Sequence, residues 1–492
     1  MEQQQIIGEN DTIAAVSTPY GMGGIAVVRV SGLRAIEAVA AAWKGRPLVD
    51  AASHTAHLGR YLSTDGELID EAVATVFRAP ASFTGEDVVE ISVHGSRWIQ
   101  REIIADLSRR GVRVANPGEF TQRAFLNGKL DLAQAEGVAD LIASSSKAAH
   151  SMALSQTKGL FSKEFDMLRD KLVEFASLLE LELDFSEEDV EFANRENLLN
   201  LANSIMARLK RLAASYSAGS VIKEGVPVVI AGIPNAGKSS VLNLLLSDDK
   251  AIVSDIPGTT RDSIEDTIEL NGILYRFIDT AGLRSTSDKI EGLGIDRARH
   301  KMRQASIVIW VLDPTVDEGL QLTELDAFRK ECPDKRIVAL VNKSDLLTPQ
   351  ANDRQSHPIQ VESSKSIAVG AEPFKSIATG ADPFKCPIIE TVQFSATTGQ
   401  GLDQLIDLLQ GYALGGYNPE SDVIVTNARH YSAILRGVET LTRAIDGITA
   451  GVSADFIAQD IRETIHHLSA ITGSITTTTL LHSIFSRFCI GK

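Results

Sequence analysis

Residues 226–247 of this chain read VPVVIAGIPNAGKSSVLNLLLS. The first six residues form an apolar, β-branched run that predicts a buried strand, and the last ten have the composition of a helix. Between them, Gly232 to Ser239 match the pattern GxxxxGKS, in which a glycine-rich turn directs backbone N–H groups toward phosphate oxygens. We expect Lys238 to meet the β- and γ-phosphates and the Ser239 hydroxyl to ligate Mg²⁺. An ordinary glycine-rich turn is the competing interpretation. The motifs that follow distinguish it from a phosphate-binding loop.

Three further motifs follow in order, each at the end of a strand-like run. They are DTAG from Asp279, NKSD from Asn342 and SAT from Ser395. The Asp345 carboxylate can accept two hydrogen bonds from the N1–H and amino group of guanine, whereas adenine has no such pair of donors. The SAT segment is expected to complete the base contacts through its backbone. The order of these motifs predicts a GTP site rather than an ATP site.

A switch segment, SDIPGTTRD, begins at Ser254, between the phosphate loop and DTAG. A threonine there is expected to ligate Mg²⁺ only while the γ-phosphate is present; Thr260 is the candidate and Thr259 its neighbour. Leu283 stands directly after DTAG, where small GTPases that position water with glutamine carry that residue. Another group must therefore orient the water. The residues expected around the nucleotide are Asn235, Ala236, Gly237, Lys238, Ser239, Ser240, Ser254, Asp255, Ile256, Pro257, Gly258, Thr259, Thr260, Asp279, Thr280, Ala281, Gly282, Asn342, Lys343, Asp345, Ser395, Ala396 and Thr397.

The composition bounds the class of protein. The chain has 492 residues, a length that predicts about three domains. Its hydrophobic fraction of 44% is typical of globular proteins. Its formal net charge of -16 argues against coating nucleic acid or membranes by bulk electrostatics. Three scattered cysteines give no disulfide framework, and neither a signal peptide nor a membrane-length apolar run is visible. We expect a cytoplasmic protein.

The sequence pattern that predicts secondary structure changes along the chain. Residues 1–128 mix short strand-like runs and turns with one helical stretch between Leu33 and Trp43. Residues 129–219 have helical periodicity, 220–414 alternate strands with helices, and 415–492 are helical again. These patterns predict a multidomain α+β and α/β protein, in which a P-loop domain with a mainly parallel, Ras-like sheet is inserted into a discontinuous helical domain. A tandem duplication at 366–385 is expected to be a surface insertion without a function of its own or a loop that docks a partner.

The motifs together resemble those of the MnmE (TrmE) tRNA-modification GTPase family. The resemblance extends beyond the phosphate loop, DIPGTTRD, DTAGLR and NKSD to DTIAAVSTPYGMGGIAVVRVSG, SFTGEDVVEISVHG, NPGEFTQRAFLNGKLDLAQAEGVADLI and the terminal IFSRFCIGK. It implies a homodimer formed through N-terminal domains, and G domains that hydrolyse GTP in a K⁺-dependent way. The positions matched as K⁺ ligands are Asn235, Ser254, Ile256 and Thr259, and Glu291 is matched as the catalytic carboxylate that orients water, beside Lys238 and Thr260.

The same resemblance implies a folate-binding-like N-terminal domain that takes 5-formyl-tetrahydrofolate or a related reduced folate. Arg29, Glu90, Lys129 and Lys492 fall at its binding positions. Without the family, each would be interpreted equally well as part of a structural salt bridge. Cys489, in the terminal CIGK, belongs to a tail that reaches toward this site; an inert buried thiol is the alternative.

The function implied is K⁺-stimulated GTP hydrolysis coupled to modification of the 5-position of the wobble uridine of tRNAs, of the aminomethyl or carboxymethylaminomethyl type. An MnmG-type FAD protein would be the partner, and the folate would supply the one-carbon unit. The alternative is a generic regulatory GTPase switch in ribosome assembly or signalling, whose nucleotide motifs would look the same. Such a switch has no reason to carry the N-terminal and C-terminal signatures.

Overall fold

The computed structural model describes residues 11–19, 21–184, 195–247, 252–253, 266–278, 302–333, 335–346, 390–486 and 488–491. The chain divides into two compact units. The first unit comprises Met1–Ser144, His150–Ala214 and Asn427–Lys492, and the second comprises Ser145–Ala149 and Ser215–Thr426. The second unit is thus inserted into the sequence of the first. The predicted multidomain α+β and α/β class is confirmed, whereas the exact boundaries at 128, 219 and 414 stay a prediction.

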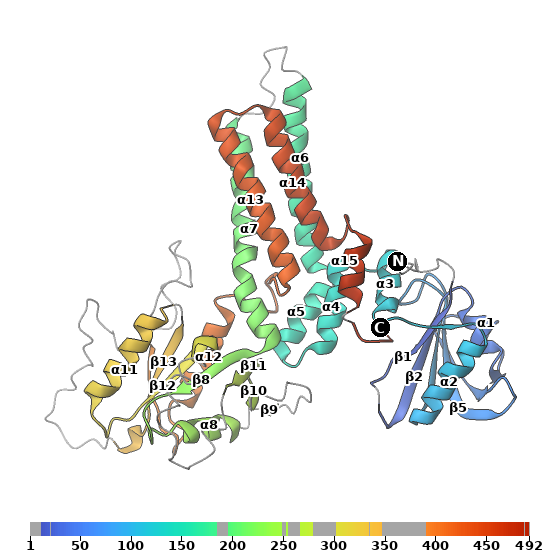
Figure 1. The fold of residues 1–492 in the computed structure, drawn as a ribbon, viewed down its shortest axis with the longest axis horizontal. Coiled ribbons are helices and arrows are strands. Elements are labelled where there is room, and N and C mark those ends of the chain that lie inside the picture. The colour runs from blue at the N-terminus through green and yellow to red at the C-terminus, as the bar shows by residue number, and fades with distance from the viewer. Residues whose placement is uncertain are drawn as a thin grey trace, which may run out of the picture. The chain divides into compact units, whose positions relative to one another are not determined.

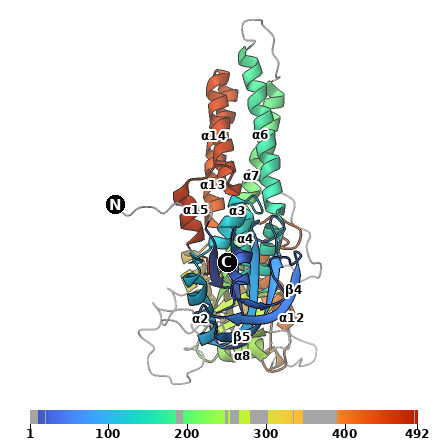
Figure 2. The same ribbon diagram turned by 90° about the vertical axis from the view of Figure 1, so that its right-hand side faces the viewer.

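The N-terminal part of the first unit is built on a mixed sheet (Figures 1 and 2). The described strands lie in the order β3-β4-β5-β6-β2-β1-β7. They span β1 Ile13–Val16, β2 Gly23–Ser31, β3 Trp43–Gly45, β4 Thr55–Leu62, β5 Leu68–Phe77, β6 Val88–Gly95 and β7 Arg113–Val114. All neighbours are antiparallel except β1 and β7. Because side chains alternate along a strand, one face of this sheet can be buried while the other stays open.

Two helices cover one face of this sheet. They are α1 (Ala35–Ala40) and α2 (Arg97–Arg109). Ala26, Val28 and Val30 of β2 are buried in the same core as Ile103 and Leu107 of α2. Full burial of a Val, Leu or Ile side chain contributes about 1.5–3 kcal/mol, so this layer stabilises the sheet. The alternating residues of β2 and β6 point to the opposite face.

The rest of the first unit is helical, and it is assembled from both halves of the sequence. The helices are α3 Glu119–Leu126, α4 Leu132–Ala143, α5 Lys147–Thr157, α6 Leu160–Asp184, α7 Arg195–Glu224, α13 Ala428–Ala450, α14 Ala454–Thr472 and α15 Thr478–Phe485, of which the start of α5 and the end of α7 belong to the second unit. Helix α14 packs against both α13 and α6 (Figure 1). At one crossing, Gly437 leaves room for Leu468, and the hydroxyls of Thr440 and Thr464 lie 2.6 Å apart.

The second unit is a doubly wound α/β fold. The described strands lie in the order β14-β13-β12-β8-β11-β10-β9. The first five of these are parallel, and β10 and β9 are antiparallel additions. The strands span β8 Val226–Ala231, β9 Ile252–Val253, β10 Asp266–Leu270, β11 Ile273–Phe277, β12 Ile307–Leu312, β13 Arg336–Val341 and β14 Glu390–Gln393, with helices α8 Lys238–Ser247, α11 Glu318–Glu331 and α12 Leu402–Leu414.

The predicted mainly parallel sheet is therefore confirmed, whereas the DTAG motif lies outside the described residues. In such sheets ligands bind at the carboxyl ends of the strands. The phosphate loop follows β8, NKSD follows β13 and SAT follows β14. One local expectation is wrong: the helical stretch does not extend to Trp43, because that residue begins β3 and pairs with Tyr61. Among the described helices, none combines the length and the apolar character needed to cross a membrane.

Candidate active site

The phosphate loop joins β8 to α8 in a backbone geometry that favours glycine. Gly232 and Gly237 have φ angles of 138° and 96°, and Asn235 has a φ of 61°. A Cβ at Gly232 would lie 2.3 Å from the carbonyl oxygen of Val311, and one at Gly237 would lie 2.2 Å from Asn342 Nδ2. No side chain fits at either glycine. The loop therefore presents its backbone to a ligand at the N-terminus of α8, where anions bind well.

Lys238 begins α8 and turns back over this loop. Its Nζ donates to the carbonyl oxygens of Gly232, at 2.9 Å, and of Ile233, at 2.7 Å. Burial lowers the pKa of the ammonium group. Ser239 follows in the first turn of the helix, with an exposed side chain. The two residues are thus placed together at the mouth of the loop, which is where the sequence motif requires an ammonium and a hydroxyl group.

Asn342 connects the phosphate loop to the segment that is expected to bind the base. This residue is buried, and its Nδ2 donates to the carbonyl oxygen of Ala236 at 2.9 Å. Its Oδ1 accepts a hydrogen bond from the backbone N–H of Ala396 at 3.1 Å. One amide side chain therefore joins three segments that are far apart in the sequence. The predicted grouping of the phosphate loop, NKSD and SAT is present in the fold.

Asp345 lies exposed beside this junction, held by a hydroxyl group. The Oγ of Ser395 donates to Asp345 Oδ1 at 2.6 Å and accepts from the backbone N–H of Thr398 at 3.2 Å. Ser395 is fully buried, so its geometry is fixed by the protein. The sequence indicated a backbone role for Ser395, and this side-chain contact was missed. Among the described contacts, this bond leaves one lone pair of Asp345 Oδ1 and both lone pairs of Oδ2 available to hydrogen-bond donors.

Other predicted site residues lie outside the part of the chain that the structure describes. They are Ser254, Asp255, Ile256, Pro257, Gly258, Thr259, Thr260, Asp279, Thr280, Ala281, Gly282, Glu291 and Lys492. The duplicated segment at 366–385 lies outside it as well. Their assignments stay predictions.

Two of the predicted folate residues pair on the face of the N-terminal sheet opposite α1 and α2. Arg29 of β2 stands opposite Glu90 of β6 in the ladder. The Arg29 guanidinium binds Glu90 Oε1 through Nε at 2.9 Å and through Nη2 at 2.8 Å. The same guanidinium lies 5.6 Å from the ring centroids of both Phe83 and Phe120. The result is an ion pair bordered by aromatic rings, in which both charged side chains remain partly exposed to solvent.

Lys129 is held beside this pair by the loop that carries Phe83. Its Nζ donates to the carbonyl oxygen of Pro80 at 3.0 Å. Asn127 Nδ2 donates to the carbonyl oxygen of Thr84 at 2.7 Å. The segment after α3 is therefore bonded to this loop at two points, which places Lys129 on the same side of the domain as Phe83.

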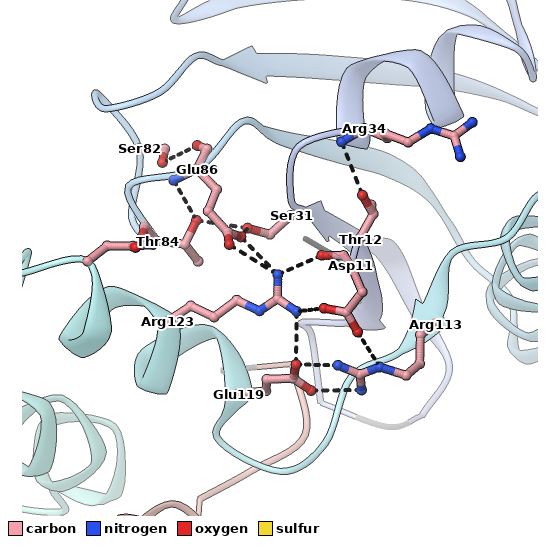
Figure 3. Close-up of polar contacts among 11 residues, drawn as sticks. Asp11, Thr12, Ser31, Arg34, Ser82, Thr84, Glu86, Arg113, Glu119 and Arg123 are labelled. Atoms are coloured by element: carbon pink, nitrogen blue, oxygen red, sulfur yellow. Dashed lines mark hydrogen bonds and ion pairs between the residues drawn. The ribbon is translucent and has the colours of Figure 1, made fainter. Parts of the chain in front are cut away.

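A buried ion cluster anchors the loop between β5 and β6, which carries Phe83 (Figure 3). Arg123 of α3 donates through Nη1 to the carbonyl oxygen of Asp11 at 2.9 Å and to the Glu86 carboxylate at 3.1 Å, and through Nη2 to Glu119 Oε1 at 3.0 Å. Ser31 Oγ donates to Glu86 Oε2 at 2.7 Å. Burial raises the pKa of Glu119, but the bonds from its arginine partners outweigh this and hold the pKa below its usual value. The cluster ties the loop to the segment that precedes β1, to the end of β2 and to α3.

The C-terminal tail also ends on the N-terminal sheet. The backbone N–H of Gly118 donates to the carbonyl oxygen of Cys489 at 3.3 Å, and Ser17 Oγ donates to that of Gly491 at 3.1 Å. A Cβ at Gly491 would lie 2.3 Å from the carbonyl oxygen of Val16, which pairs with the residue before Arg29. The Cys489 side chain is exposed rather than buried, so the alternative of a buried thiol is wrong.

Comparisons with known proteins cover almost the whole chain. The family model of the GTP-binding protein TrmE N-terminus matches residues 12–129, and that of the MnmE helical domain matches residues 132–489. The tRNA modification GTPase MnmE of Bacteroides fragilis (strain ATCC 25285) is 48% identical over 487 residues, covering 98% of this chain and 99% of that protein. The protein of the same name from Christiangramia forsetii is 46% identical over 495 residues, covering 98% of this chain and 99% of that protein.

Solved structures match part of the chain with low TM-scores. The G domain of the T. maritima FeoB iron transporter has a TM-score of 0.23 and 25% identity, covering 38% of this chain and 98% of that one. A tyrosine-to-alanine variant of Aquifex aeolicus Era bound to GDP and AlF4- has a TM-score of 0.25 and 21% identity, covering 44% of this chain and 66% of that one. The full-length relatives and the two family models decide the matter: the chain belongs to the MnmE family of tRNA modification GTPases.

Proposed function

We propose that this GTPase of tRNA modification hydrolyses GTP with Mg²⁺ in a K⁺-stimulated reaction and, with an MnmG-type FAD protein, modifies the 5-position of a wobble uridine. A reduced folate of the 5-formyl-tetrahydrofolate type would supply the one-carbon unit. The observation that carries the nucleotide part is the position of Asn342, which joins the phosphate loop to the SAT segment. A nucleotide that spans both ends of this junction meets phosphate donors at one end and the Asp345 carboxylate at the other.

The phosphate end of the site is supplied by this chain's own backbone and two side chains. The N–H groups of the loop and the N-terminus of α8 would bind the β- and γ-phosphates. Lys238, now bonded to two loop carbonyls, would exchange them for phosphate oxygens. The ammonium group is charged in both cases, but the phosphate oxygens carry negative charge, so the exchange replaces bonds to neutral carbonyls by bonds between opposite charges.

The residues present suit both proposed metal ions. Ser239 offers a hydroxyl oxygen in the first turn of α8, the oxygen chemistry that Mg²⁺ prefers, and Thr260 would be its switch partner. Asn235, exposed in a left-handed conformation, offers an amide oxygen for K⁺, with Ser254, Ile256 and Thr259 as further ligands. When bound, a monovalent cation there would neutralise charge that develops between the β- and γ-phosphates.

The water-orienting role is assigned to Glu291. Leu283 cannot orient water, since its side chain has no hydrogen-bonding group. A carboxylate can accept a hydrogen bond from a bridging water and so align the nucleophile. Lys238 and Thr260 would complete the catalytic set by stabilising and sensing the γ-phosphate.

The folate would bind where Arg29 and Glu90 pair. The carboxylate suits the donor edge of a pterin, and a pterin can stack on the rings beside the guanidinium. Lys129 and Lys492 would bind the glutamate tail of the cofactor. Cys489, exposed on the tail that ends at β1, is a further candidate for the modification step.

The proposal includes a homodimer through the N-terminal domains and action on tRNA in the cytoplasm. With a net charge of -16, the chain would meet RNA through a local surface or through its partner protein.

The test is GTP hydrolysis by the full chain in K⁺ and in Na⁺ at equal ionic strength. We expect faster hydrolysis in K⁺, an Asn235→Ala variant that loses the difference between the salts, and a Glu291→Ala variant that binds GTP but does not hydrolyse it. Asn243→Ala, which removes an exposed amide from α8, is the matched control and should behave as wild type. Equal rates in both salts would contradict the K⁺ mechanism. Binding of a reduced folate, lost on Arg29→Ala, would exclude a generic switch.

A further inference from the structure

Lys343 of the NKSD segment does not point freely into solvent. Its backbone has a φ of 59°, in the left-handed region that residues other than glycine seldom adopt. Its Nζ lies 2.5 Å from Asp313 Oδ2. Asp313 comes directly after β12 and is 3% exposed. A buried carboxylate on the neighbouring strand thus takes the charged end of a residue that was predicted to bind GTP.

Asp313 is itself held firmly. Its Oδ1 accepts from the backbone N–H of Thr315 at 2.9 Å and from the Thr315 hydroxyl at 2.6 Å. Its backbone forms a reciprocal pair with the buried Gln321: Asp313 N–H donates to Oε1, and Nε2 donates to the Asp313 carbonyl, both at 2.9 Å. Burial raises the pKa of Asp313, but the Lys343 ammonium and the Thr315 bonds outweigh burial and lower the pKa overall.

This arrangement changes what Lys343 can do. Because the ammonium group of Lys343 is paired with the Asp313 carboxylate, its charge is not available to a ligand. The methylene stem remains partly exposed, between Asn342 and Asp345 in the sequence. Such stems cover flat apolar surfaces well, and a stem with its end fixed loses less entropy when a ligand covers it. The stem is therefore preorganised beside the carboxylate that reads the base.

We propose that Asp313 is a positioning residue for guanine-nucleotide binding, acting through Lys343 by fixing that side chain against the purine ring. The proposal rests on the nucleotide site described above and adds a residue outside all four nucleotide motifs. Because the stem contacts the ring face rather than its donor edge, the effect is on affinity for any purine bound there. Selection of guanine remains with Asp345.

The experiment is a double-mutant cycle with GDP and Mg²⁺, measured by calorimetry on the full chain. Asp313→Asn keeps the size of the side chain and removes its charge, and we expect GDP binding about tenfold weaker. Lys343→Met keeps the stem and removes the ammonium. The double variant should bind no more weakly than the weaker single variant, because both changes break one interaction. In steady-state hydrolysis, Asp313→Asn should raise KM for GTP and leave kcat unchanged.

The control is Asp317→Asn, four residues along the same loop. Asp317 is exposed and caps α11 by accepting from the Gly319 N–H, without contact to Lys343 among the described bonds. It should bind GDP as wild type. If Asp313→Asn does not fold, Thr315→Val, which removes one bond to Oδ1, should give a smaller loss of the same sign. The inference would be overturned if the losses of GDP affinity in the two single variants multiply in the double variant, or if Asp313→Asn binds GDP as wild type does. A wild-type chain that does not bind GDP would instead overturn the nucleotide site itself.

Discussion

Removal of the Glu136 carboxylate should loosen the helical part of the first unit. Glu136 of α4 is buried, and its two oxygens accept from Arg429 of α13 at 2.9 and 2.8 Å. His430 Nε2 lies 2.6 Å from Glu136 Oε2. Arg429 also donates to the carbonyl oxygens of Ala470 and Ile471 at the end of α14. A single carboxylate thus holds the residues that join three helices.

The size of the effect follows from the pKa. Burial acts to raise the pKa of Glu136, but the charges and hydrogen bonds of His430 and Arg429 lower it from 4.5 to about 2. At about 1.36 kcal/mol for each pH unit, this difference corresponds to about 3 kcal/mol. Loss of one partner from other buried ion pairs costs about 3–5 kcal/mol. Because the folded-state pKa lies below the unfolded one, the contribution is fully present above about pH 4.5 and is lost as the pH falls toward 2.

Hydrogen exchange measures this locally, which suits a chain of several parts better than a single melting curve. At pH 7, Glu136→Gln should speed exchange in peptides from α4 and α13 by about a hundredfold, as expected for a loss of about 3 kcal/mol. The control is Glu463→Gln, which breaks a half-exposed pair with Arg443 on the same helical body and should change exchange little. Equal exchange in Glu136→Gln and wild type, or equal acceleration in the control, would refute the reasoning.

Three further predictions concern the two candidate sites. Gly237→Ala should weaken GDP binding at least tenfold in calorimetry, because its Cβ would lie 2.2 Å from Asn342 Nδ2 at a φ of 96°; near-wild-type affinity would contradict the loop geometry. Asp345→Asn should shift preference from GTP to XTP in competition binding, because an amide donates to the 2-oxygen of xanthine where the carboxylate accepted from guanine. Arg123→Ala should destabilise the N-terminal domain by about 3–5 kcal/mol, because it leaves the fully buried Glu119 without one partner; faster proteolysis of residues 11–128 would report it, and an unchanged rate would count against the cluster.

The sequence predicted the parts of the fold whose signals are local. The strands at β8, β12 and β13 are continuous apolar runs, and β8 and β13 each end in a motif that needs a defined turn. Gly232 and Gly237 could be placed because their spacing encodes backbone angles that few other residues adopt. The same is true of Asp345, whose chemistry is contained in four consecutive residues.

Contacts between distant residues could not be predicted in this way. Glu136 and Arg429 are 293 positions apart, and each alone is typical of a solvated helix charge. Asp313 follows an apolar strand without a motif of its own, so only the pairing of β12 with β13 reveals its contact with Lys343. The helical stretch was expected to run to Trp43, but Trp43 pairs with Tyr61 of β4, and aromatic residues such as Trp favour strands.

The insertion of the second unit depends on packing of the same long-range kind. The chain enters this unit along the end of α7 and leaves it near Val425. There the Val425 N–H donates to Ser215 Oγ at 3.0 Å, and a Cβ at Gly219 would lie 2.3 Å from the Val425 carbonyl oxygen. Only glycine lets the returning segment come so close to the helix. Because the entering and leaving segments lie side by side, a unit of about two hundred residues can interrupt the helical part without separating its halves. The motifs therefore locate the chemistry, whereas the close approach of the entering and leaving segments depends on a single glycine that is indistinguishable in sequence from any other.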